Sequence, residues 1–132
     1  MQDNHISDDR ARTFAGALRR FEQDGDAAAF AELFADDAVT QRFDARGERK
    51  GEVRQFWTEY RGQFDEVRTT FYNAVEGQDE FALEWTSKGT LRSGNPLHYR
   101  GVTCLGYAGD KIAWLRTYYD SAVFVAPAAA TG

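Results

Sequence analysis

The stretch FAELFADDAVTQRF, from Phe30 to Phe43, changes from a helical to a strand-like pattern. Phe30 lies four positions before Phe34, as residues on one helix face do, whereas the segment from Val39 to Phe43 has the composition of a short strand. Two carboxylates, Asp36 and Asp37, lie at the join. They are either a catalytic pair or the residues that end the helix, and the rest of the sequence has to distinguish the two.

Helical periodicity lies on both sides of this stretch. A helix over residues 7–23, with Ser7 as a suitable cap, is indicated by one apolar face made of Phe14, Ala17, Leu18 and Phe21. Gly25 ends this helix, and Asp26 can cap a second, short one. A third helix follows a charged loop over residues 44–51, and its apolar face is Val53, Phe56, Trp57, Tyr60 and Phe64.

After the third helix the apolar period changes from 3.6 to 2. Four segments rich in β-branched and aromatic residues indicate strands: EVRTTFYNAVEG (66–77), EFALEWTSKGTL (80–91), PLHYRGVTCLGY (96–107) and DKIAWLRTYYDSAVFV (110–125). Helices followed by strands predict an α+β fold, with the helices on one face of an antiparallel sheet. We expect one domain over residues 1–132, with a core at about 8–124 and a loose tail at 125–132.

Composition limits the function classes. The chain has 132 residues and a net charge of −5, which suits one core and argues against binding to nucleic acid. It lacks the run of roughly 20 apolar residues that a membrane helix needs, and its polar start is unlike a signal peptide. Because Cys104 is the single cysteine, we expect a cytoplasmic protein. With only His5 and His98 besides, we expect no metal site, and no glycine-rich phosphate signature supports a nucleotide cofactor.

The order of several short motifs resembles the SnoaL-like branch of the nuclear transport factor 2-like superfamily. These motifs are the stripe of the first helix, Phe30–Ala38, Gly51, Phe56–Trp57, Leu83–Thr86, Gly109–Ile112 and Arg116–Asp120. The resemblance covers about residues 8–124 and implies a cone, in which a strongly curved antiparallel sheet wraps around three N-terminal helices and encloses a pocket. It also implies that Asp36 and Asp37 form a water-facing corner between helix and strand.

The family includes steroid isomerases, epoxide hydrolases, polyketide cyclases, dehydratases and proteins without activity, so the resemblance implies a fold and not one reaction. Its steroid-isomerase pattern needs acids and a tyrosine where this sequence has Arg42, Leu18 and Thr103. Its epoxide-hydrolase pattern needs two carboxylates and an arginine where this sequence has Thr86, Thr117 and Glu84. A dehydratase of this fold would use a histidine, but His98 lies on the strand face opposite Tyr99.

The resemblance directs a largely polar set of side chains into the pocket: Leu18, Arg42, Trp57, Tyr60, Glu84, Thr86, Tyr99, Thr103, Thr117 and Tyr119. Alternation groups the strand residues by face but does not tell which face is inside. The alternative core of the strand over 81–91 is its other face, with Phe81, Leu83 and Trp85. Arg42 and Glu84 are then either a salt bridge, or a catalytic pair in which Glu84 moves a proton and Arg42 holds an oxygen.

Three functions remain open. The first is a pocket for a small, mostly apolar molecule, with cofactor-free acid–base chemistry of the isomerase, hydrolase or cyclase type and Glu84 as the catalytic residue. The second is a ligand-binding protein without activity, and the third is a homodimeric association module. A homodimer through the sheet is expected in any case, because apolar groups seldom stay in water on an outward row such as Arg100, Val102, Cys104, Trp114 and Tyr118.

Overall fold

The computed structural model of the chain describes residues 6–44 and 47–120, and at residues 44 and 47–51 it describes the backbone alone. The expected tail at 125–132 lies outside these residues. The elements follow in the order α1 (Asp9–Asp24), α2 (Ala27–Ala31), β1 (Phe34–Asp44), β2 (Gly47–Gly51), α3 (Val53–Arg61), β3 (Phe64–Glu76), β4 (Glu80–Leu91), β5 (Pro96–Ala108) and β6 (Lys111–Tyr119).

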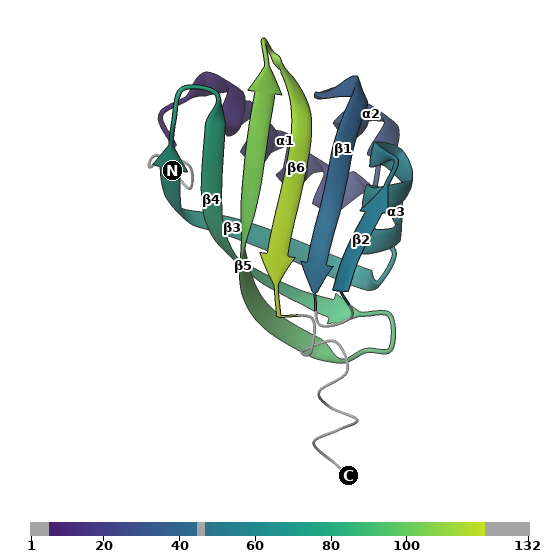
Figure 1. The fold of residues 1–132 in the computed structure, drawn as a ribbon. Helices are drawn as coiled ribbons and strands as arrows, with labels where there is room; N and C mark the ends of the chain where they lie inside the picture. The colour runs from purple at the N-terminus through teal and green to yellow at the C-terminus, as the bar shows by residue number, and fades with distance from the viewer. Residues whose placement is uncertain (1–5, 45–46, 121–132) are drawn as a thin grey trace.

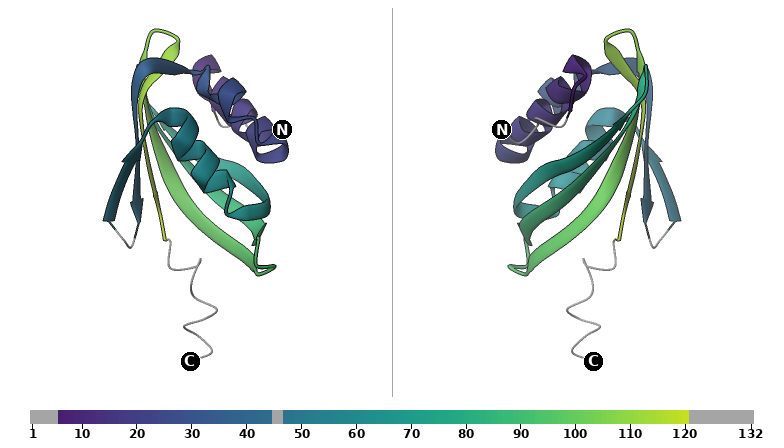
Figure 2. Two further views of the ribbon diagram at one scale, coloured as in Figure 1. Left: turned by 90° about the vertical axis from the view of Figure 1, so that its right-hand side faces the viewer. Right: turned by 90° about the vertical axis from the view of Figure 1, so that its left-hand side faces the viewer.

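The six strands form one sheet in the order β2-β1-β6-β5-β4-β3. Neighbouring strands are antiparallel except β1 and β6, which run parallel. Figure 1 shows the sheet in front of the helices, and the side views in Figure 2 show it curving around them, with α1 and α3 on its concave side. The predicted α+β fold with a curved sheet around the helices is therefore confirmed, and the sheet contains one parallel pair.

The first helix begins one residue later than its predicted cap implies. The side chain of Asp8, and not that of Ser7, accepts hydrogen bonds from the backbone N–H groups of Arg10 and Ala11, which have no partners inside the helix. At the other end Gly25 has φ 68°, and its N–H donates to the carbonyl oxygen of Phe21. A glycine adopts this left-handed backbone at no steric cost, so it ends α1 as the sequence predicts.

Three predicted boundaries are wrong, because pairing between strands overrides the local pattern. Phe34 and Phe64 begin β1 and β3 instead of ending helices, and residues 47–51, expected to be a loop, form β2 at the edge of the sheet. Asp36 and Asp37 lie within β1 and are exposed, where the register with β6 shifts between Phe34 and Val39. The exposure of the two carboxylates fits the predicted structural role.

The core lies between the helices and the inner face of the sheet. The rings of Phe21 and Phe30 stack with centroids 5.1 Å apart, and Trp57 packs edge-on against Phe30 at 5.0 Å. On the strands, buried residues alternate with more exposed ones, and Leu83, Leu105, Ile112 and Leu115 are fully buried. This alternation fixes which face of each strand points inward.

The outer face of the sheet carries the row predicted to face outward. In β5 the residues Tyr99 and Thr103 are buried and face the core. Val102 and Cys104, the sequence neighbours of Thr103, therefore lie on the outer face. On β6 the guanidinium of Arg116 lies over the Trp114 ring at 4.1 Å, and Tyr118, which is 39% exposed, stacks on Phe43. Partly exposed aromatic groups therefore cover part of this face.

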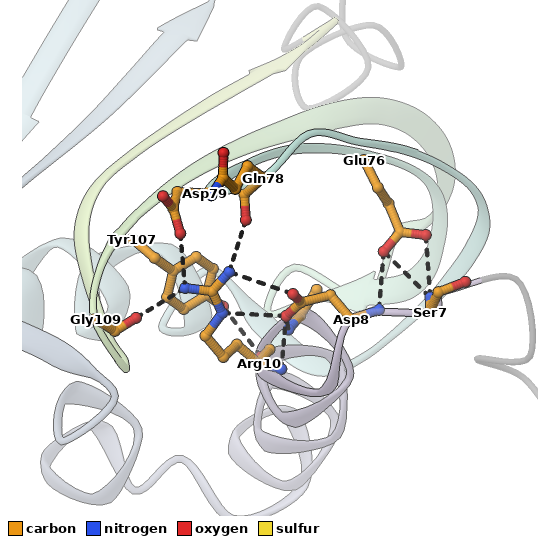
Figure 3. A network of polar contacts seen from close by, with 9 residues as sticks. Ser7, Asp8, Arg10, Glu76, Gln78, Asp79, Tyr107 and Gly109 are labelled. Carbon is orange, nitrogen blue, oxygen red and sulfur yellow. Dashed lines mark hydrogen bonds and ion pairs between the residues drawn. The ribbon is translucent and has the colours of Figure 1, made fainter.

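Arg10 fixes the start of α1 to one end of the sheet (Figure 3). Its guanidinium donates to the Asp79 carboxylate at 3.1 Å and to the carbonyl oxygens of Gln78 and Gly109 at 2.9 Å each. It also lies over the Tyr107 ring, 4.7 Å from the centroid. Since the three hydrogen-bond partners belong to the β3–β4 and β5–β6 turns, one side chain joins the start of α1 to both turns. It thereby sets how α1 lies on the sheet.

Candidate functional site

A small cavity lies between α1, α3 and the inner face of the sheet. Its volume of about 20 Å³ has room for about one water molecule, so a larger ligand would have to displace side chains of the wall. The lining is aromatic and aliphatic with a few polar groups, and it consists of Leu18, Glu22, Arg42, Phe56, Trp57, Tyr60, Thr69, Trp85, Thr103, Thr117 and Tyr119.

Most of the predicted site residues lie together in this wall: Leu18, Arg42, Trp57, Tyr60, Thr103, Thr117 and Tyr119. Tyr99 lies behind them, and its hydroxyl makes a short hydrogen bond with that of Tyr60. The structure thus assembles these side chains from α1, α3, β1, β5 and β6. Their role in binding stays a prediction.

The predicted inward orientation of Glu84 and Thr86 is wrong. Phe81, Leu83 and Trp85 of β4 are buried instead, because the apolar face of this strand packs against the helices. On the outer face the Glu84 carboxylate accepts a hydrogen bond of 2.6 Å from the side chain of its register partner on β3, Asn73. Glu84 therefore does not meet Arg42, and neither the salt bridge nor the catalytic pair forms.

The carboxylate of the cavity wall is Glu22 from α1, which is 4% exposed. Its Oε1 accepts a hydrogen bond of 3.0 Å from the Thr69 N–H, and its Oε2 accepts one of 2.5 Å from the Thr69 hydroxyl. Burial raises the pKa of Glu22 to about 6, although the bonds from Thr69 and the charges of Arg61 and Arg19 act to lower it. A carboxyl with this pKa can both accept and release a proton near neutral pH.

A chain of hydroxyl groups connects Glu22 with Tyr60. The Thr69 and Ser87 hydroxyls are 2.6 Å apart, and Ser87 faces Tyr99 in the β4–β5 register and bonds its side chain. Tyr99 in turn bonds Tyr60. Burial raises the pKa of both tyrosines above their ordinary value, so both stay neutral at physiological pH. Glu22 is therefore the member of this chain that changes its charge near neutral pH.

The two tryptophans of the wall differ in their hydrogen bonds. Trp85 Nε1 donates to the Thr103 hydroxyl at 2.9 Å, which lies 3.1 Å from the Thr117 hydroxyl. Trp57 Nε1 is buried and has no hydrogen-bond partner among the residues that the structure describes. The guanidinium of Arg42 lies over the Phe56 ring, 5.4 Å from its centroid. The wall thus contains a cation, an indole donor and a carboxyl whose pKa burial raises to about 6.

Glu22 also lines an open groove of about 1,050 Å³ at the ends of α1 and α3. The groove has charges of both signs, from Arg19, Arg61, Arg68, Lys88, Asp65 and Glu66, and it contains the exposed His98. This mixture favours no one sign of ligand charge. Glu22 is therefore the carboxyl shared by the inner cavity and the outer groove.

Two kinds of functional feature are absent from the described residues. Within residues 6–44 and 47–120, no three histidine, cysteine or acidic side chains are grouped as metal ligands would be. The helices of the same residues are all too short or too polar to cross a membrane.

Comparisons with known proteins give a family and a fold. The family model described as the SnoaL-like domain matches residues 14–128. No curated protein sequence matches the chain. An NTF2-like protein from Anabaena variabilis has 18% identity and a TM-score of 0.76, over 90% of this chain and 91% of that one.

Two solved structures of similar fold contain small molecules by their descriptions. A protein with a ketosteroid isomerase-like fold from Catenulispora acidiphila, in complex with trimethylamine, has 19% identity and a TM-score of 0.72, over 86% of this chain and 89% of that one. TerC, co-crystallised with polyporic acid, has 14% identity and a TM-score of 0.72, over 89% and 93% of the two chains. At such identities the likeness shows the fold alone.

Proposed function

Because this chain belongs to the SnoaL-like family of the nuclear transport factor 2-like superfamily, we propose that it binds a small, mostly apolar molecule in its inner cavity and catalyses cofactor-free acid–base chemistry on it. The observation that carries this proposal is Glu22, a buried carboxyl with a pKa of about 6 in the cavity wall. Glu22 takes the role that the sequence assigned to Glu84. We propose that the protein acts as one domain, with its core at about residues 8–124.

The proposed chemistry is proton transfer next to a carbonyl group. The apolar part of the substrate packs against rings such as Trp57 and Tyr119, and the Glu22 carboxylate takes a proton from the carbon beside the carbonyl. The electron pair moves onto the carbonyl oxygen, where the positive charge of Arg42 stabilises it. Glu22 then returns the proton to the substrate. An isomerisation follows if the proton returns to a different carbon, and a cyclisation follows if the intermediate attacks an electrophilic carbon of the same substrate.

Ligand binding without catalysis is the second candidate. It is favoured by the engagement of both Glu22 oxygens with Thr69, which holds the carboxylate within the protein. The complexes of similar folds with trimethylamine and with polyporic acid support a small-molecule ligand under either proposal. The single cysteine supports a reducing, cytoplasmic compartment for both.

Hydrogen exchange in D₂O tests the catalytic proposal without knowledge of the substrate. Acetophenone and cyclohexanone are incubated with the protein, and loss of the proton signals beside the carbonyl is followed by NMR. We expect the parent protein to accelerate exchange on at least one ketone, Glu22→Gln to abolish the acceleration and the outer-face control Glu84→Gln to keep it. No acceleration of either ketone, or acceleration that survives Glu22→Gln, contradicts the catalytic proposal.

A further inference from the structure

Trp57 and Trp85 form a natural comparison inside one cavity. Both are 5% exposed, and both line the cavity wall. The Trp85 indole has an internal partner in Thr103, whereas Trp57 Nε1 is buried without a partner among the described residues. Buried polar groups in proteins are nearly always hydrogen-bonded, so this exception needs an explanation.

The surroundings of Trp57 keep its indole in place. Four aromatic rings pack against it edge-on at centroid distances from 5.0 to 6.1 Å, and they belong to Phe21, Phe30, Phe56 and Tyr60. These rings come from α1, α2 and α3, and the one hydroxyl among them, that of Tyr60, is bonded to Tyr99. Because Trp57 lines the cavity, an acceptor oxygen on a molecule in the cavity would satisfy Nε1.

We propose that Trp57 Nε1 is the donor that selects cavity ligands carrying a neutral acceptor oxygen, namely small ketones and related carbonyl compounds. A hydrocarbon of the same shape would leave the donor unsatisfied, which is unfavourable in a buried site. Arg42 and Glu22 bring opposite charges to the same wall, so the wall favours neither a cation nor an anion. A neutral carbonyl oxygen satisfies the Trp57 donor without bringing a net charge into the buried site. This inference rests on the proposed function only in placing the ligand in the inner cavity.

Two probes of almost equal shape separate hydrogen bonding from apolar packing. Acetophenone and ethylbenzene share one skeleton, and only acetophenone has a carbonyl oxygen. Protein with ¹⁵N-labelled tryptophan is titrated with each compound, and the indole signals are assigned by Trp57→Phe and Trp85→Phe. We expect acetophenone to move the Trp57 indole proton downfield and the Trp85 proton much less, whereas ethylbenzene leaves the Trp57 proton nearly unchanged.

The affinities give a second readout. Trp57→Phe should weaken acetophenone binding by about three- to tenfold, the size of one lost neutral hydrogen bond, and should leave ethylbenzene binding nearly unchanged. Trp85→Phe, the matched control, should change both affinities by similar factors. If one variant does not fold, nuclear Overhauser effects from each indole proton to its neighbouring rings assign the signals of the parent protein, and these signals still test the proposal.

The inference is overturned by equal responses of Trp57 to the two compounds, by a response of Trp85 alone, or by no response to either, as when the cavity admits only water. Catalysis is not needed for this test. If ketone exchange in D₂O fails but Trp57 responds to acetophenone alone, the inference stands and the non-catalytic function replaces the catalytic one.

Discussion

Replacing Glu22 by Gln should change how stability depends on pH. The substitution preserves the shape of the side chain and an oxygen that can accept from Thr69, but it removes the ionisable group. In the parent protein, burial raises the pKa of Glu22 from 4.5 to about 6. A tenfold change in a protonation equilibrium corresponds to about 1.4 kcal/mol, so this difference corresponds to about 2 kcal/mol of stability.

The direction of this change in stability with pH depends on whether the folded or the unfolded state holds the proton more tightly. Below pH 4.5 the carboxyl is protonated in both the folded and the unfolded chain, and its full contribution to stability is present. As the pH rises towards 6, the unfolded chain releases the proton first, so the folded state loses stability. Above pH 6 the loss stays at about 2 kcal/mol. Relative to the parent, Glu22→Gln should therefore gain about 2 kcal/mol between pH 4 and pH 8.

Urea denaturation followed by tryptophan fluorescence, at several pH values from 4 to 8, measures this difference. Any constant effect of the substitution on packing cancels, because only the change with pH is compared. Glu84→Gln is the matched control, since it removes a carboxylate from the outer face of the sheet. It should keep the loss of stability between pH 4 and pH 8 that Glu22 causes. Parallel profiles of the parent and Glu22→Gln would refute the reasoning, and a relative loss of stability would show that Thr69 and Arg61 outweigh desolvation.

Two further predictions concern the packing of the sheet and its association. At Gly101 an added Cβ would lie 2.6 Å from the Trp85 ring, so Gly101→Ala should lower the free energy of unfolding in urea by about 1–3 kcal/mol. The control is Gly16→Ala in α1, where an added Cβ has no contact nearer than 3.8 Å, and it should raise the free energy of unfolding by about 0.5–1 kcal/mol. Equal effects of the two substitutions would contradict the packing of Gly101 against Trp85. For the homodimer that the sequence leads us to expect through the outer face of the sheet, light scattering should give twice the chain mass, and Val102→Glu should give a monomer while Val75→Glu on the edge strand does not. A monomeric parent protein contradicts the dimer.

Much of the fold could be predicted because periodicity reflects burial directly. The faces of α1 and α3 and the alternation in β3 to β6 appear in the sequence as apolar periods of 3.6 and 2. The strand β2 could not be found in this way, because Gly47–Gly51 contains no apolar residue. It is held by backbone pairing with β1, and such pairing depends on what the rest of the chain presents at the sheet edge.

The site could be predicted only as far as local alternation goes. Alternation correctly grouped Glu84 with Thr86, but the choice between the two faces of β4 depends on which one buries more apolar surface. The face with Phe81, Leu83 and Trp85 buries more apolar surface and is the inner one. The sequence already contained these three apolar residues as the alternative core face. The importance of Glu22 was missed, although it lies four residues after Leu18 and therefore on the same helix face. A charged residue within an apolar stripe is the signal that could have identified it.

The arrangement of the cavity is itself an argument for a ligand. A buried carboxyl with a raised pKa and a buried indole donor without a described partner each reduce stability, and both lie in the wall of one cavity. An apolar replacement of the same shape would remove either cost, since cores tolerate volume-conserving apolar exchanges. Proteins break the rules of core packing chiefly at functional sites. A carbonyl compound in this cavity would satisfy the indole, and Glu22 in the same wall is the group that the proposed proton transfer needs, so one function would explain why both groups are kept.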